Sequence, residues 1–271
     1  MSEMWDSVAG AWERNAAFVD AQLEAATAAM LDAAQIGLGD AVLDVGAGPG
    51  GAGIAAAARV GRSGTVVLSD VAPEMVQAAG RRAADLPQVS TLVCDEVRID
   101  AADETFDAVI CRHGLMFPDE PAAAVREARR VLRADGRYVA ITWDAREANP
   151  WLGLVLDAVG EQFGVPFPPP NVPGPFSLGD PAVLAEALAS GGLLDVEVVR
   201  MATPMHGASL DAWWELVPQL AGPLAMALAG MEDNVREEIR TRALQYGAAA
   251  AQPGDEGIEL AGSVLIASGR R

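Results

Sequence analysis

The feature that most limits what this chain can fold into is a repeat of apolar runs and helical segments between residues 41 and 144. Apolar runs rich in Val, Ile, Leu and Ala occupy 41–45, 65–70, 89–95, 105–113 and 136–144. Amphipathic stretches separate most of them, at 51–60, 72–85 and 120–134. Continuous apolar strands alternating with helices are typical of a parallel sheet covered on both faces. Right-handed crossovers then predict a doubly wound α/β sheet.

Segments of a different kind flank this repeat. Helices are expected at 3–35, 149–164, 180–190 and 209–248, and strands at 194–202 and 258–271. The run VPFPPPNVPGPF at 165–176 holds too many prolines for a helix or an inner strand. We expect it to strap over the core or a ligand, and a partner-binding polyproline segment is the alternative.

The stretch VLDVGAGPGG at 42–51 combines the end of the first strand with a glycine-rich turn. It matches the G-x-G-x-x-G pattern of dinucleotide-binding proteins. It equally matches the pattern D-x-G-x-G-x-G, from Asp44 to Gly50, of the loop that binds the methyl donor in methyltransferases. Both patterns let the backbone approach a ligand at the start of a helix, where free N–H groups are available. The loop by itself therefore leaves a nicotinamide-type cofactor and a methyl donor both open.

Charge and composition restrict the partners. The chain has a formal net charge of −19, and its 19 basic residues are all arginines, scattered along the sequence. A protein that tracks phosphates needs a basic footprint, so we expect no nucleic acid partner. The longest apolar runs are far too short for a membrane span, and the first residues do not resemble a signal peptide. We therefore expect a cytoplasmic protein, with a homodimer as one hypothesis for its oligomeric state.

Three acids stand at the ends of successive predicted strands: Asp44, Asp70 and Asp95. A carboxylate in the position of Asp70 can accept the ribose hydroxyls of either cofactor. An acid beside the glycine turn would repel a pyrophosphate but favours a cationic ligand. The three acids together favour S-adenosylmethionine, whose sulfonium and ammonium groups are positive. Asp44 has a structural alternative, which is to cap the following helix or order the turn.

With these acids, the stretches VLDVGAGPG, VVLSDVAPEMV, FDAV and RVLRADGRYV make the chain resemble the class I S-adenosylmethionine-dependent methyltransferases, in the group related to the ubiquinone/menaquinone methyltransferases. The resemblance implies a mostly parallel, seven-stranded Rossmann-like sheet of order 3-2-1-4-5-7-6, with the last strand antiparallel and helical lid insertions. In that order Cys94 and Cys111 end strands about 14 Å apart, too far for a disulfide, so two free thiols are expected.

The resemblance also implies positions for the cofactor. Asp44, Gly46, Ala47 and Gly48 would line the methionine end, which Cys111 and Arg112 would flank. Asp70 would hold the ribose, and Val71 and Met75 would border the adenosine. Asp95, Glu96 and Val97 would lie beside the adenine, and the helix that carries Trp12 would cover the cofactor. Trp12 has an alternative role as a core anchor.

The expected organisation is one methyltransferase domain spanning 1–271. It comprises an N-terminal helical cap at 1–35, a cofactor-binding core at 36–144, and lid or substrate-binding insertions at 145–192 and 205–255. Aromatic residues gather in or beside the insertions. We expect 1–20, 145–176 and 205–250 to close over the carboxyl edge of the sheet, which suits an apolar acceptor. A satellite core beneath long loops is the alternative.

The two histidines, His113 and His206, are the candidate catalytic residues. An ordinary imidazole can act as a base near neutral pH if the acceptor must lose a proton, and a packing role is the alternative. No cluster of His and Cys resembles a metal site, so no metal is expected. The predicted function is methyl transfer to a small or medium-sized apolar or aromatic molecule. The alternatives are a protein or RNA methyltransferase and a dinucleotide-dependent oxidoreductase.

Overall fold

A central seven-stranded sheet dominates the computed structural model, which describes residues 2–170, 172–255 and 257–271. In spatial order the strands are β3 (Val89–Val93), β2 (Thr65–Asp70), β1 (Ala41–Val45), β4 (Phe106–Arg112), β5 (Leu132–Trp143), β10 (Ser263–Arg270) and β6 (Leu194–Ala202). The first five are parallel to one another, and β10 runs antiparallel to both neighbours. This order and the antiparallel last strand confirm the predicted sheet.

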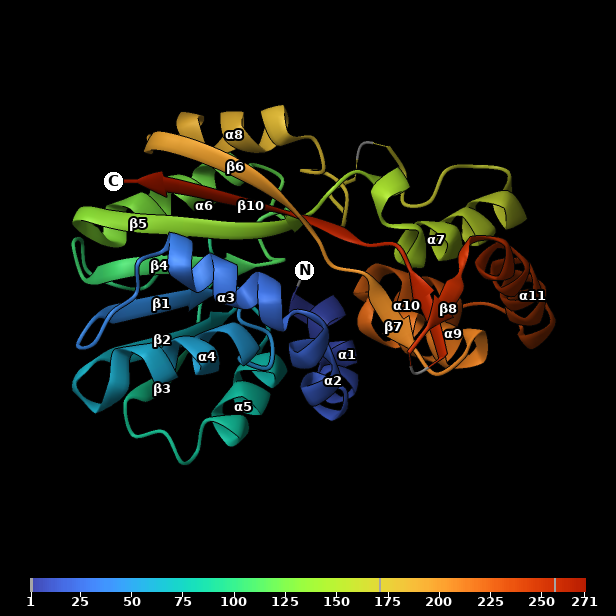
Figure 1. Cartoon of the computed structure of the whole chain (residues 1–271), viewed down its shortest axis with the longest axis horizontal. Coiled ribbons are helices and arrows are strands. Elements are labelled where there is room, and N and C mark those ends of the chain that lie inside the picture. Colours follow the sequence, from blue (N-terminus) through green and yellow to red (C-terminus); the bar gives the residue numbers. More distant parts are fainter. Residues whose placement is uncertain (1, 171, 256) are drawn as a thin grey trace.

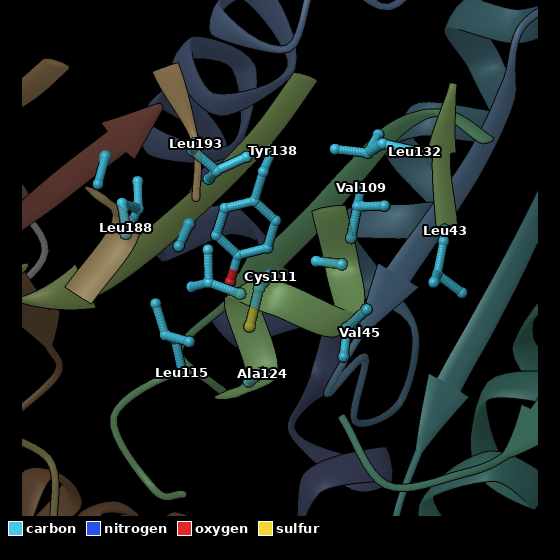
Figure 2. Close-up of a cluster of buried hydrophobic side chains, with 14 of the residues drawn as sticks. Leu43, Val45, Val109, Cys111, Leu115, Ala124, Leu132, Tyr138, Leu188 and Leu193 are labelled. Carbon is cyan, nitrogen blue, oxygen red and sulfur yellow. The ribbon is translucent and has the colours of Figure 1, made fainter. Parts of the chain in front are cut away.

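Helices cover both faces of this sheet (Figure 1). One face carries α3 (Glu24–Ala33), α4 (Gly51–Val60), which the short 3-10 helix η1 (Gly61–Ser63) follows, and α5 (Pro73–Arg82). The other face carries α6 (Pro121–Val131) and α8 (Pro181–Ser190). Figure 2 shows the core on this second face, where Tyr138 of β5 lies among leucines and valines. Burial on both faces explains why the inner strands are apolar without alternation.

A second group of elements lies beyond the carboxyl ends of the parallel strands (Figure 1). It contains the 3-10 helix η2 (Arg146–Ala148), α7 (Pro150–Phe163), α9 (Leu210–Leu220), α10 (Gly222–Ala229), α11 (Asp233–Ala250) and a small sheet of β7 (Met205–Gly207), β9 (Gly257–Leu260) and β8 (Gln252–Gly254). Helices α7, α9, α10 and α11 and strands β7 and β9 share a hydrophobic core of their own, which includes the fully buried Trp213. We call this group the lid. The N-terminal helices α1 (Ser2–Arg14) and α2 (Ala16–Gln22) lie between the lid and the sheet.

Two expectations from the sequence need correction, and one small sheet was not expected. The single strand expected at 258–271 is two strands in different sheets, because the chain turns at Gly262. A β-carbon there would lie 2.2 Å from the carbonyl oxygen of Thr203, so only glycine fits. Helix α8 lies within the expected lid insertion at 145–192 but packs on the sheet, because Leu184 and Leu188 are fully buried there. The small three-stranded sheet was not foreseen, since its strands have only three or four residues each.

Candidate functional site

A large cavity opens where the carboxyl ends of the parallel strands face the lid. Its walls come from the loops after β1, β2, β3 and β4, from α1 and α2, and from α7, α9 and α10 of the lid. The space between these walls, part of which is open to solvent, measures about 1620 Å³. The three segments expected to form a cover all contribute side chains to it.

The glycine turn after β1 forms part of the cavity wall. Gly46 and Gly48 have φ angles of +64° and +54°, which favour glycine. A β-carbon on Gly46 would lie 3.3 Å from the Cα atom of Gly114, whereas the corresponding position on Gly48 meets nothing within 4 Å. The backbone therefore passes tightly against the loop after β4 and then presents a bare edge to the open cavity.

Acidic side chains line the cavity near the glycine turn. Asp70 is held by two backbone bonds: Gly48 N donates to its Oδ2 at 2.9 Å, and Ala72 N donates to its Oδ1 at 2.9 Å. Asp95 and Glu96 follow β3 and line the cavity beside it. Burial raises the pKa of Asp70 above its usual value, and burial together with Asp95 and Asp70 raises the pKa of Glu96 to about 8. A positive ligand at this end would favour the ionised carboxylates.

Asp44 lies beneath the glycine turn and is not part of the cavity wall. Its side chain is fully buried, and its Oδ2 accepts a hydrogen bond from Gly53 N, in the first turn of α4, at 2.7 Å. Its Oδ1 has no hydrogen-bond partner among the described residues. Burial raises the pKa of Asp44 to about 7. The capping role that was the structural alternative is the one seen in the structure.

Two further predicted cofactor residues are absent from the cavity wall. Val97 is exposed, at 38% of its full surface. Cys111 is completely buried in the core under α6, where the Tyr138 hydroxyl points toward its sulfur (Figure 2). Its Sγ lies 4.0 Å from Oε2 of Glu96. Burial raises the pKa of this thiol well above its ordinary value, and both Cys111 and Cys94 are free thiols.

Arg112, at the end of β4, lines the cavity and forms an ion pair with Asp20. Its Nη2 lies 2.9 Å from Oδ1 of Asp20 in α2, and its Nη1 donates to Oγ1 of Thr27. Asp20 also binds Arg82 of α5 at 2.6 Å, and Arg82 donates to the carbonyl of Pro49 in the glycine turn. Asp20 and Arg82 could not be recognised from the sequence, because single charges on amphipathic helices usually face solvent.

His113 follows β4 directly and adopts a left-handed backbone conformation, with φ of +62°. Its ring stacks on Trp143, with the ring centroids 3.9 Å apart and the planes at 14°. Both ring nitrogens are buried and have no hydrogen-bond partner within the described chain. Burial, aided by the charge of Arg112, lowers the pKa of His113 to about 3. The imidazole is therefore neutral at ordinary pH.

His206 is not brought to the cavity. It lies in β7 with its side chain half exposed, and its Nδ1 is 3.7 Å from Oε2 of Glu259 in the neighbouring strand β9. Its neighbour Met205 takes the place that faces the cavity, because successive side chains of a strand point to opposite sides. No observation supports a catalytic role for His206.

Aromatic residues divide between the cavity and the core of the lid. Trp12, Trp143 and Trp151 line the cavity, and Trp12 Nε1 donates to the carbonyl of Leu220 in α9 at 2.9 Å. Trp213 and Trp214 are buried inside the lid instead, as the satellite-core alternative predicted. Phe167 and Phe176 of the proline-rich segment pack against the same core, so this segment straps the lid. Residue 171 of that segment lies outside the described residues.

The donor set at the strand ends fits S-adenosylmethionine better than a dinucleotide. The bare glycine edge and three carboxylates suit a ligand with positive charges and ribose hydroxyls. Within the described part of the wall, Arg112 is the one basic side chain, and it is paired with Asp20. A pyrophosphate would find no uncommitted cation there. The sequence-based residues that meet on this wall are Trp12, Gly46, Ala47, Gly48, Asp70, Val71, Met75, Asp95, Glu96, Arg112 and His113.

Two properties relevant to partners can be read from the described residues. None of the described helices is long and apolar enough to cross a membrane. In the same part of the chain, no three His, Cys, Asp or Glu side chains are grouped to hold a metal ion. The expectation of no metal stays a prediction.

Comparison with known proteins places this site in context. Residues 42–136 match the model of a methyltransferase domain. The nocamycin O-methyltransferase of Saccharothrix syringae is 32% identical over 202 residues, which cover 65% of this chain and 71% of that protein. The ubiquinone/menaquinone biosynthesis C-methyltransferase UbiE of Paraburkholderia phymatum is 32% identical over 126 residues, 41% of this chain and 52% of its own length. The solved YcgJ protein of Bacillus subtilis has the same fold, with a TM-score of 0.59, 20% identity and coverage of 92% and 98% of the two chains.

Proposed function

Because the chain belongs to the class I S-adenosylmethionine-dependent methyltransferases, we propose that it methylates a small or medium-sized apolar or aromatic molecule. The observation that carries this proposal is that one cavity has two kinds of lining. Carboxylates and bare glycine backbone line it at the ends of β1, β2 and β3, and tryptophans and lid helices line other parts of it. Two relatives are named for nocamycin and for ubiquinone/menaquinone biosynthesis, which supports a small-molecule acceptor.

We propose the cofactor-binding roles as follows. Asp70 accepts the ribose hydroxyls, Asp95 and Glu96 flank the adenine, and the backbone at Gly46 and Gly48 receives the methionine end. Asp44 lies behind the wall and fixes the start of α4, whereas Arg112 lies on the wall and fixes the cap helix α2 through Asp20. The chemistry that S-adenosylmethionine supplies when bound is a methyl group already activated on a sulfonium. The protein then has to align the acceptor and exclude water, and alignment alone can contribute about 7–11 kcal/mol.

His113 is proposed to contact the acceptor as a neutral hydrogen-bond partner. General-base catalysis is most efficient when the pKa of the base lies near the working pH. A pKa of about 3 makes His113 a weak base. One of its two unpartnered nitrogens can instead form a hydrogen bond with an acceptor hydroxyl or carbonyl, which would remove the free-energy cost of leaving that nitrogen unpaired.

The cofactor proposal is tested by calorimetry with S-adenosylhomocysteine and NADH. We expect S-adenosylhomocysteine to bind and NADH not to bind; the reverse result would favour the oxidoreductase alternative. The acceptor proposal is tested with a methyl-labelled donor and a panel of small phenols and quinones, next to total protein and RNA. Label that enters only protein or RNA would contradict a small-molecule acceptor.

The role of His113 predicts a particular pH dependence. With a hydroxyl acceptor, His113→Gln should lower kcat/KM by roughly 5- to 150-fold, the equivalent of about 1–3 kcal/mol for a lost buried hydrogen bond. Because His113 is neutral throughout, the ratio of wild-type to variant kcat/KM should stay constant from pH 5 to pH 8. A ratio that collapses as the pH falls below 6.5 would show that His113 titrates in that range and acts as a base.

A further inference from the structure

The acceptor half of the cavity is built as a continuous aromatic wall. The ring of His113 stacks on Trp143, and Trp143 meets Trp151 edge to face, with centroids 4.9 Å apart at 67°. All three residues line the cavity. Such ring pairs attract one another and favour a further aromatic ring in stacked or edge contact.

Hydrogen bonds hold this wall in position from behind. Trp151 Nε1 donates to Oδ1 of Asn149 at 3.2 Å, and Asn149 is completely buried. The carbonyl of Trp151 accepts from Trp213 Nε1 at 2.7 Å, which joins the wall to the core of the lid. A wall fixed in this way is preorganised, so little conformational entropy is lost when a planar ligand binds.

Thr203 lies next to Trp151 of this wall, in the turn that joins β6 to β7. Its backbone N–H donates to the carbonyl of Gly262 at 2.8 Å. A β-carbon on Gly262 would lie 2.2 Å from the Thr203 carbonyl oxygen and 3.4 Å from Cδ1 of Trp151, so these three residues pack tightly. Thr203 lines the cavity and is only 8% exposed, yet its hydroxyl has no hydrogen-bond partner among the described residues.

Charge is confined to the other half of the cavity. The charged side chains of the described wall are Asp70, Asp95, Glu96 and Arg112, which stand at or just after the ends of β2, β3 and β4. Among the described residues that line the cavity, those from Trp143 to Pro223 in the sequence include no charged side chain. A charged acceptor would be desolvated there without an ionic partner, which costs far more free energy than the burial of a neutral polar group.

On the basis of the proposed methyl transfer, we propose that Thr203 determines acceptor specificity: the acceptor is a neutral, planar aromatic molecule with two oxygen groups, one near His113 and a second one bound by the Thr203 hydroxyl. The aromatic wall holds the ring between these two polar ends. The unpaired threonine hydroxyl discriminates between ligands, because only a ligand with the second oxygen supplies its missing hydrogen-bond partner.

Calorimetry on the full chain saturated with S-adenosylhomocysteine tests this inference. The probes are 1-naphthol and 2-naphthol, each with one oxygen, and the 1,5-, 2,6- and 2,7-dihydroxynaphthalenes, each with two. At least one dihydroxynaphthalene should bind wild type about tenfold or more tighter than either naphthol. Thr203→Val keeps the side-chain shape and should reduce this preference to about twofold, with unchanged affinity for the naphthols. Thr203→Ser should retain the preference. The control Thr91→Val, on the exposed edge strand β3, should behave as wild type.

Two results would overturn the inference: wild type shows no preference for any dihydroxynaphthalene, or Thr203→Val keeps the preference. If the valine variant does not bind S-adenosylhomocysteine, Thr203→Ala replaces it in the same comparison. Failure of wild type itself to bind S-adenosylhomocysteine would overturn the proposed function, and that result is separate from the naphthol comparison.

Discussion

At the scale of single residues, the acids at the strand ends have different tasks that follow from their burial. Asp70 reaches the cavity, whereas Asp44 is sealed beneath the glycine turn. Both carboxylates accept backbone N–H groups, Asp70 from the glycine turn and Asp44 from the first turn of α4. One therefore belongs to the proposed binding surface, and the other supports the local fold on which that surface depends.

Asp70→Ala should weaken S-adenosylhomocysteine binding by about tenfold or more, because it removes the proposed ribose acceptor and the acceptor of the Gly48 N–H. Calorimetry measures this change directly. Asp85→Ala removes an exposed carboxylate from the end of α5 and is the matched control. Retained affinity in Asp70→Ala would remove this residue from the proposed site.

Asp44 makes the stability of the ligand-free protein depend on pH. Its pKa is raised to about 7 in the folded state from 3.8 in the unfolded chain, so the folded state binds more protons between these values. The contribution of Asp44 to the free energy of unfolding is therefore present at low pH and is lost as the pH rises from about 4 to 7. Glu96, with a pKa raised to about 8, adds a loss of the same sign.

Asp44→Asn removes the ionisation and should reduce this loss by up to about 1.4 kcal/mol per pH unit. Urea unfolding at pH 5, 6 and 7 measures the slope for wild type and variant. Asp85→Asn should keep the wild-type slope. Equal slopes in wild type and Asp44→Asn would show that the buried carboxylate is ionised throughout this range.

At the scale of elements, the cap helix α2 is joined to the core by Asp20. This carboxylate is shared between Arg112 at the end of β4 and Arg82 in α5. The Arg112 side chain is only 9% exposed, so the loss of its partner would leave a nearly buried charge without compensation. The carbonyl of Pro49 ties the same network to the glycine turn.

Asp20→Ala should lower the free energy of unfolding by about 3 kcal/mol, the lower end of the range for breaking a buried pair, and should weaken S-adenosylhomocysteine binding through the loosened turn. Asp32→Ala is the matched control, since Asp32 pairs with Arg59 from a side chain that is 72% exposed. Such pairs contribute about 0–1 kcal/mol. Urea unfolding compares the two, and equal losses would show that burial of Arg112 does not matter.

At the scale of the whole molecule, the sheet and the lid have separate hydrophobic cores that meet around one cavity. A ligand that contacts both should therefore stabilise the packing of the lid on the sheet. At 100 times its Kd, a ligand adds about 2.7 kcal/mol to the stability of the state that binds it. This effect should appear first where opening is local.

Hydrogen exchange with and without saturating S-adenosylhomocysteine tests this coupling. Amides of α1, α2 and α9 should exchange up to about 100-fold more slowly with ligand, because these helices line the cavity. Helix α8 lies on the sheet face outside the cavity wall and serves as the internal reference. Protection limited to the turns after β1 and β2 would show that the lid does not close over the ligand.

Much of this organisation was determined by the sequence alone. Apolar runs without alternation predicted the parallel sheet, and Asp70, Asp95 and the glycines marked the edge where its strands end. The apolar runs and the glycine turn are local features of the sequence. The order of strands and helices is compatible with few topologies, so it also predicts the fold. The same reasoning placed His113 at the cavity, because it directly follows a strand that ends there.

Only the tertiary structure decided which side chains reach the cavity. Asp44 and Cys111 are buried below it and His206 faces solvent, although each lies within two residues of one that lines it. The pKa of His113 and the unpaired hydroxyl of Thr203 depend on contacts with segments far away in the chain, such as Trp143 and Gly262. Burial and desolvation arise from packing between distant segments, and no local pattern in a sequence records them.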